Sequence, residues 1–144
     1  MSELRILHGT EVGELLLRMS SDAVDQIILI APFIKAAVMK TILKNVSDET
    51  EIKCLTRWRA DEVASGVSDL EVYEIIKEKK GNVSLIQNLH AKYYRGDEVV
   101  LLGSSNLTQA ALGWSNRSNQ ELMIQAKLNQ EFSKYEEMIF RKAI

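Results

Sequence analysis

The stretch LHAKYYRGDEVVLLGSSNLTQAALGWSNRSNQE, from Leu89 to Glu121, decides how we interpret the fold of this chain. Two strand-like segments, 89–94 and 98–102, flank an Arg-Gly-Asp sequence whose glycine permits a tight turn. A turn of small polar residues, 103–106, follows the second segment. The pattern predicts a β-hairpin that leads into a polar loop.

The rest of the chain alternates helix-like and strand-like patterns. Apolar stripes at helical spacing occupy 12–19, 38–43, 70–76 and 132–139, and short apolar runs occupy 26–31, 51–56, 83–86 and 122–126. Alternating elements that end in a hairpin predict an α/β fold with a mixed, largely parallel β-sheet sandwiched by helices. Without an internal repeat or a Pro/Gly-rich linker, residues 1–144 are expected to form one domain, either complete or a module of a larger protein.

Composition places the chain among ordinary soluble proteins, with 46% hydrophobic and 26% charged residues. Its one cysteine, Cys54, cannot form an internal disulfide, which fits a reducing compartment. The N-terminus lacks the pattern of a secretory signal, and the apolar run 27–34 is too short to cross a bilayer. We therefore expect a cytoplasmic protein that does not associate with membranes.

The residues of the opening stretch carry a distinctive set of polar groups. His90 and Lys92 are one residue apart, so they would share one face of a strand, although a solvated edge strand explains the pair equally well. The Gly103–Asn106 turn precedes an apolar stripe at 107–112, which predicts a helix whose N–H groups could hold an anionic oxygen. Such turns are also ordinary helix caps. With a carboxylate at Glu121, these groups could attack a phosphodiester without a metal.

In combination, the motifs resemble the HKD signature of the phospholipase D superfamily. The match comprises His90-x-Lys92, Asp97, Gly103-Ser104-x-Asn106 and Asn119-x-Glu121, with one residue fewer than usual between Asp97 and Gly103. Two further segments, Thr56-Arg-Trp-Arg59 and Gly66-Val-Ser-Asp69, are similar to the branch with metal-independent restriction endonucleases and modules fused to helicases.

The resemblance implies a role for each matching residue. His90 would attack phosphorus and form a covalent phosphohistidine, while Lys92 and Asn106 would hold the non-bridging oxygens. Ser104 would complete the pocket, and Glu121 would accept a hydrogen bond from the second imidazole nitrogen of His90. For Asp97, at the turn, we prefer a structural role.

The implied mechanism needs two histidines, and the chain has only one other, at His8. His8 lacks a lysine partner and a Gly-Ser-x-Asn turn. The prediction is a homodimer in which each copy contributes His90 to a shared site. Neither a metal nor another cofactor is expected.

Four residues near the motifs are candidates for substrate binding: Arg57, Arg59, Trp114 and Arg117. The net charge of −2 is unfavourable for a nucleic-acid partner, but positive charge gathers in or near the predicted site, at Arg57, Arg59, Lys92, Arg95 and Arg117. For Trp114, a role as a partly buried loop anchor is an equal alternative.

The predicted function is a metal-independent phosphodiesterase, with DNA favoured as substrate. The alternatives are a phospholipase or phosphatidyltransferase that acts on lipid, and a nucleic-acid-binding module with little catalysis of its own. An additional specificity or helicase domain is an expected partner if the chain is a module.

Overall fold

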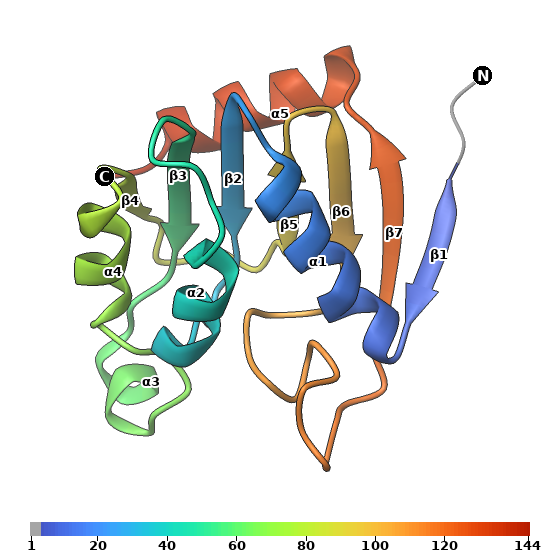
Figure 1. Ribbon diagram of the computed structural model, residues 1–144. Helices are drawn as coiled ribbons and strands as arrows, with labels where there is room; N and C mark the ends of the chain where they lie inside the picture. The colour runs from blue at the N-terminus through green and yellow to red at the C-terminus, as the bar shows by residue number, and fades with distance from the viewer. Residues whose placement is uncertain (1–3) are drawn as a thin grey trace.

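The computed structural model describes residues 4–144, which form a seven-stranded sheet in the order β1-β7-β6-β5-β2-β3-β4 (Figure 1). The strands are β1 (Arg5–His8), β2 (Gln26–Ile30), β3 (Glu51–Thr56), β4 (Asn82–Leu85), β5 (Tyr93–Gly96), β6 (Val99–Gly103) and β7 (Leu122–Lys127). The helices are α1 (Thr10–Asp22), α2 (Ala36–Leu43), α3 (Ala60–Ala64), α4 (Val72–Glu78) and α5 (Gln130–Arg141).

Helices lie on both faces of the sheet, with α1 and α2 on one face and α5 across the other (Figure 1). The central strand β2 is therefore buried on both sides, which explains its unbroken apolar sequence. Ile27 and Leu29 join the core under α1 and α2, whereas Ile28 and Ile30 join the core that includes side chains of α5. The predicted mixed sheet flanked by helices is confirmed.

The balance of strand directions differs from the expected, largely parallel sheet. Among the described residues, the pairs β2–β3 and β3–β4 are parallel, and the other four strand pairings are antiparallel. A parallel connection needs a crossover of a dozen or more residues, usually helical. The chain from β4 to β5 has no helix, and a hairpin joins β5 to β6. Strand β5 accordingly runs antiparallel to both of its neighbours, β2 and β6.

The sequence pattern does not predict strand β1 or helix α3, and it assigns the wrong buried residues to the helix near 70–76. The edge strand β1 buries only Leu7, so it carries little apolar signal, and helix α3 has no buried residue. In the 70–76 stripe, Leu70 and Tyr73 are 50% and 43% exposed. Helix α4 instead buries Val72 and Ile76.

The strand order brings the ends of strands that are far apart in the sequence to the same edge of the sheet. Strands β2, β3 and β6 end there, and the antiparallel strands β5 and β7 begin there. The segments next to these ends contain Phe33, Arg57 and Asn106 after strands, and His90 and Glu121 before strands. Residues far apart in the sequence thus meet at this edge.

A buried ion pair fixes α5 to strand β5 of the sheet. The guanidinium of Arg95, which is 6% exposed, donates from Nε and Nη2 to Glu136 at 2.5 and 2.8 Å. The hydroxyl of Tyr93 donates to the same carboxylate at 2.5 Å. Asn129 caps the helix by accepting from the N–H of Phe132 at 2.9 Å.

Asp97 ties the β5–β6 turn to the beginning of β2. Its carboxylate accepts from the backbone N–H groups of Val24, Asp25 and Gln26 at 2.7, 2.9 and 3.0 Å. The residue itself has a left-handed φ of 47°, which Asp tolerates better than most residues. Burial opposes the charge, but these three donors lower the pKa of Asp97 below its ordinary value.

The substitution Asp97→Asn should lower the free energy of unfolding at neutral pH by about 1–3 kcal/mol, because an amide cannot accept all three N–H groups. Since the folded pKa of Asp97 is depressed, its contribution is full above about pH 5 and is lost as the pH falls through the folded pKa, below 3.8. Urea unfolding of both proteins from pH 7 to pH 2.5 measures this. A difference that stays constant with pH, or matches that of exposed Asp22→Asn, would contradict the role.

Candidate active site

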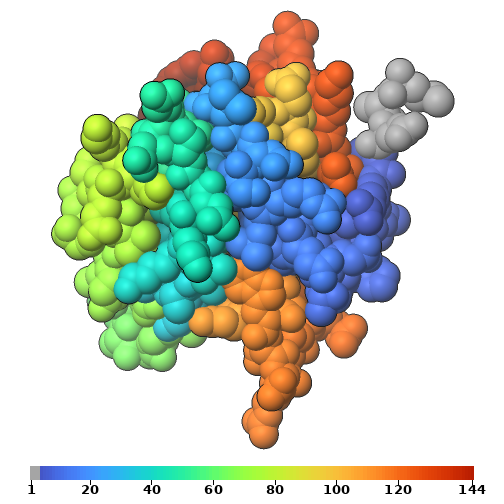
Figure 2. Space-filling model, viewed as in Figure 1, coloured from blue at the N-terminus to red at the C-terminus, as the bar shows by residue number. Residues whose placement is uncertain are grey.

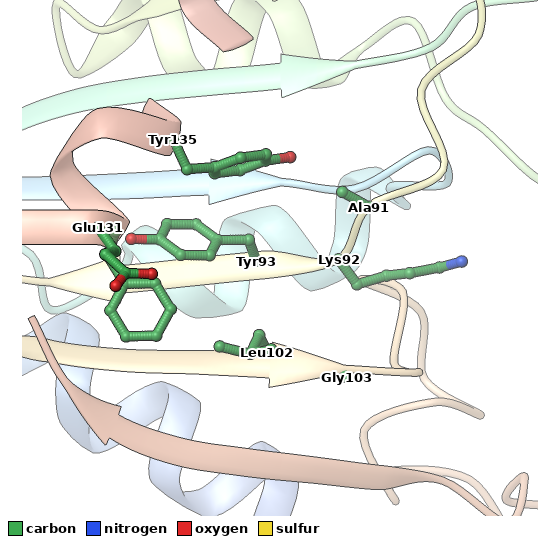
Figure 3. Close-up of a pocket in the computed structure, with 8 residues that line it drawn as sticks. Ala91, Lys92, Tyr93, Leu102, Gly103, Glu131 and Tyr135 are labelled. Atoms are coloured by element: carbon green, nitrogen blue, oxygen red, sulfur yellow. The ribbon is translucent and has the colours of Figure 1, made fainter. Parts of the chain in front are cut away.

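His90 and Lys92 lie in an irregular segment just before β5, whereas the sequence predicted a strand from 89. The ladder between β2 and β5 stops at the pair Ile30–Tyr93, and Pro32, which follows β2, has no N–H to extend it. His90 is exposed. The side chain of Lys92 extends past the start of β5, away from the sheet (Figure 3).

The loop between β6 and β7 projects from the same edge (Figure 2). The helix predicted over 107–112 is wrong, because this segment consists of turns. Leu107 pairs instead with the segment after β2: its N–H donates to Phe33 O at 3.1 Å, and its carbonyl accepts from Lys35 N at 3.0 Å. Because the backbone of Leu107 is committed to this pairing, the segment 107–112 does not supply the helix N-terminus that the sequence predicts.

Asn106 is held by the same pairing. Its Oδ1 accepts from the N–H of Phe33 at 3.2 Å. Within residues 4–144, no protein acceptor forms a hydrogen bond with its Nδ2. The bond to Phe33 therefore orients the amide and leaves its two N–H groups for another acceptor, such as an anionic oxygen.

Glu121 has partners other than the one expected from the resemblance. Its Oε1 accepts from Ser104 Oγ at 2.5 Å, and its Oε2 accepts from Asn119 Nδ2 at 3.0 Å. In the described part of the chain, it forms no hydrogen bond with His90. The β6–β7 pairing explains this: Ser104 N donates to Leu122 O at 3.0 Å, which places the serine hydroxyl beside Glu121. The role of Asn119 was not anticipated from the sequence.

Lys92 is the cation of this site. Partial burial lowers the pKa of Lys92, the positive charge of Arg57 lowers it further, and Glu121 acts in the opposite direction. Arg57 and Glu121 therefore both lie within electrostatic range of Lys92. A poorly hydrated ammonium interacts more strongly with an incoming anion than a fully solvated one does.

Arg57, a candidate for substrate binding, is 8% exposed and fully engaged within the chain. Its Nε and Nη2 donate to Glu62 at 3.0 and 2.6 Å, and its Nη1 donates to Leu89 O at 2.8 Å. This burial argues against direct contact with a substrate. Arg59 is exposed, and its Nε and Nη2 donate to Gln87 O at 3.1 and 2.8 Å.

Trp114 and Arg117 differ in the same way. Trp114 packs against the main core, and its ring lies where a side chain on Gly13 of α1 would be. Trp114 therefore anchors the long loop between β6 and β7 to α1. Arg117 is exposed in that loop, and remains a candidate for substrate contact.

The second histidine, His8, ends β1 and pairs with Leu122. It lies at the same edge of the sheet as His90. However, β1 is three strands from β5, or about 14 Å at the usual spacing between strands. His90 and His8 are therefore not neighbours in the sheet.

A cavity of about 470 Å³ lies next to Lys92 on the face of the sheet that α5 covers. Its walls include Tyr93, Phe132 and Tyr135, and the two tyrosine rings are seen over the sheet in Figure 3. Within residues 4–144, no group of three or more His, Cys, Asp or Glu side chains is arranged to hold a metal ion. None of the helices described has the length and apolar character to cross a membrane.

A family model described as "Cardiolipin synthase, PLD-like domain" matches residues 16–143. The chain belongs to this PLD-like family. The resemblance found in the sequence is thereby confirmed. No curated protein sequence matches this PLD-like chain.

Solved structures share the fold of the PLD-like chain. NucT from Helicobacter pylori has a TM-score of 0.78 at 13% identity, over 100% of this chain and 99% of that one. Nuc from Salmonella typhimurium, a phospholipase D family member, has a TM-score of 0.77 at 17% identity, over 100% and 97%. TrmBL2, an archaeal chromatin protein with a novel mode of DNA binding, has a TM-score of 0.66 at 18% identity, over 98% and 53%. At these identities the similarity establishes the fold.

The contact between α1 and the long loop predicts the effect of Gly13→Ala. The added methyl group would overlap the Trp114 ring and lie 2.5 Å from the carbonyl oxygen of Leu112. Overpacking costs about 1–3 kcal/mol, and here it should exceed the gain in helix propensity of about 1 kcal/mol. We expect a net loss of stability in thermal or urea unfolding. The neighbouring exposed Glu14→Ala is the control, and an unchanged or more stable Gly13→Ala protein would contradict this packing.

Proposed function

We propose that this PLD-like chain is a metal-independent phosphodiesterase that cleaves DNA. The observation that carries the proposal is the set of polar groups at one edge of the sheet. An exposed imidazole at His90, a half-buried cation at Lys92 and the amide N–H groups of Asn106 lie there, beside the Ser104–Glu121 pair. Membership of the PLD-like family supports action on a phosphodiester.

The reaction would proceed in two displacements on phosphorus. A nitrogen of His90 attacks, the P–O bond to the leaving alkoxide breaks, and a second imidazole donates a proton to that alkoxide. The second imidazole then takes a proton from water, the hydroxide attacks phosphorus, and the P–N bond breaks to release His90. Lys92 and the amide of Asn106 would stabilise the charge on the non-bridging oxygens in both steps. Protein groups thus supply the nucleophile and the charge stabilisation.

The second imidazole would come from another copy of the chain. His8 is about 14 Å away across the sheet, counted as three strand spacings. A two-fold axis beside the exposed His90 would bring the His90 of the second copy to the same phosphorus. This arrangement would also place two Lys92 ammonium groups around one phosphate.

DNA is favoured over lipid because exposed guanidinium groups flank this edge. Arg59 and Arg117 are both exposed, and could contact phosphates on either side of the scissile bond. The DNA-binding mode named for TrmBL2 is consistent with this choice. The alternative is a phosphatidyl-group substrate, which the family description and the apolar cavity beside Lys92 favour.

The proposal predicts DNA cleavage that depends on His90 and continues in EDTA. Purified protein is incubated with plasmid DNA, single-stranded DNA and phosphatidylglycerol vesicles, all with chelator. His90→Ala should reduce DNA cleavage at least about 1,000-fold, because the covalent step is lost. His8→Ala is the matched control, since it removes the other imidazole of the chain, and it should retain activity.

Lipid turnover without DNA cleavage would select the alternative substrate. DNA binding without cleavage of any substrate would select the binding-module alternative. An equal loss of DNA cleavage in the His8→Ala and His90→Ala variants would contradict the assignment of His90 as the nucleophile.

Mixed dimers test the shared site. Wild-type and His90→Ala subunits are unfolded, mixed in equal amounts and refolded together. If each active site needs both copies of His90, the mixture should show about one quarter of the activity of an equal total amount of wild-type protein, whereas independent sites would give about one half. Sedimentation velocity on the same samples checks that the subunits form dimers. A value of one half, or a monomeric active protein, would rule out the shared site.

A further inference from the structure

Arg57 is a buried cation whose contacts lead to both halves of the candidate site. It follows β3, at the edge where the polar groups converge. On one side its Nη1 donates to the carbonyl of Leu89, the residue directly before His90. This bond is 2.8 Å long and is buried, so water does not compete for it.

On the other side, Arg57 contacts the residue that orients Asn106. Its guanidinium carbon lies 5.1 Å from the centre of the Phe33 ring, within the range of a cation–π contact. The backbone N–H of Phe33 in turn donates to Asn106 Oδ1 at 3.2 Å. One side chain thus spans the gap between the segment of His90 and the segment that holds Asn106.

Glu62 neutralises this cation and fixes its orientation. Two parallel N–H···O bonds, at 3.0 and 2.6 Å, join the guanidinium to the carboxylate. The side chains are 9% and 15% exposed. A paired and buried guanidinium is poorly available to a phosphate of the substrate, which separates Arg57 from the exposed Arg59.

We propose that Arg57, oriented by Glu62, is a positioning residue that sets the location of His90 relative to Asn106. The proposal rests on the function proposed above. The planar guanidinium presents donors in two directions, toward Glu62 and Leu89, while its face meets Phe33. Lysine has the charge but a single nitrogen, so it cannot maintain all of these contacts.

The test uses Arg57→Lys, and also Arg57→Met combined with Glu62→Gln, which leaves no unpaired buried carboxylate if the single variant is unstable. Arg18→Met, an exposed arginine on α1, is the matched control for loss of one guanidinium. The first readout is hydrogen–deuterium exchange of peptides that cover 86–92 and 104–107, which requires no substrate. The second is steady-state cleavage of a DNA oligonucleotide.

In both Arg57 variants, exchange in these two segments should be at least about 10-fold faster than in wild type. Exchange in the strands of the sheet should be unchanged. The value of kcat should fall about 10- to 100-fold while KM stays within about twofold, because misplacement of reacting groups affects the transition state. The Arg18→Met protein should match wild type in both measurements.

Unchanged exchange in 86–92 would overturn the proposal, whatever the activity. A raised KM with unchanged kcat, together with a weaker dependence of cleavage on salt, would also overturn it, because that pattern identifies a direct phosphate contact. If the wild-type protein cleaves no DNA, the proposed function fails, but the exchange measurement still decides whether Arg57 joins the two segments.

Discussion

The antiparallel pairing of β5 with β2 is the interaction on which the rest of the structure depends. It joins a parallel part, β2-β3-β4, to an antiparallel part, β1-β7-β6-β5, in one sheet. At one end of this pair, the carboxylate of Asp97 closes the turn after β5 onto the N–H groups that precede β2. At the other end the pairing stops near Pro32, and the chain on both sides leaves the sheet. The polar site occupies the place where this ladder can no longer continue.

The positively charged side chains at this edge of the sheet differ in burial and in pairing. Arg57 is buried and paired with Glu62, and it donates a hydrogen bond to the backbone before His90, so it links segments of the chain. Lys92 has no such partner among the described salt bridges, so its ammonium group is available to an anion. Arg59 and Arg117 are exposed and could add longer-range attraction. Cys54, by contrast, is fully buried, and burial raises the pKa of its thiol to about 12, which makes it a core residue.

The positions of the two histidines at this edge are the basis for the proposed site shared between two copies of the chain. The strand order places His8 and His90 on one side of the sheet but three strands apart. The exposed position of His90 instead leaves it accessible to a second copy. The carboxylate of Glu121 is engaged with Ser104 and Asn119, so its first effect in this chain is to shape the loop around the site.

The sequence by itself determined which residue types are available to the proposed site and where the central elements of the fold lie. The apolar runs of β2 and β3 and the spacing of His90, Lys92 and Asn106 are local features, so they could be interpreted without coordinates. Only the tertiary structure decided which groups are free to act. The turns at 107–112, the burial of Arg57 and the partners of Glu121 all depend on backbone and side chains distant in the sequence. The physical reason is that spacing along the chain fixes periodicity and composition, whereas hydrogen-bond partners and burial follow from the order in which strands assemble.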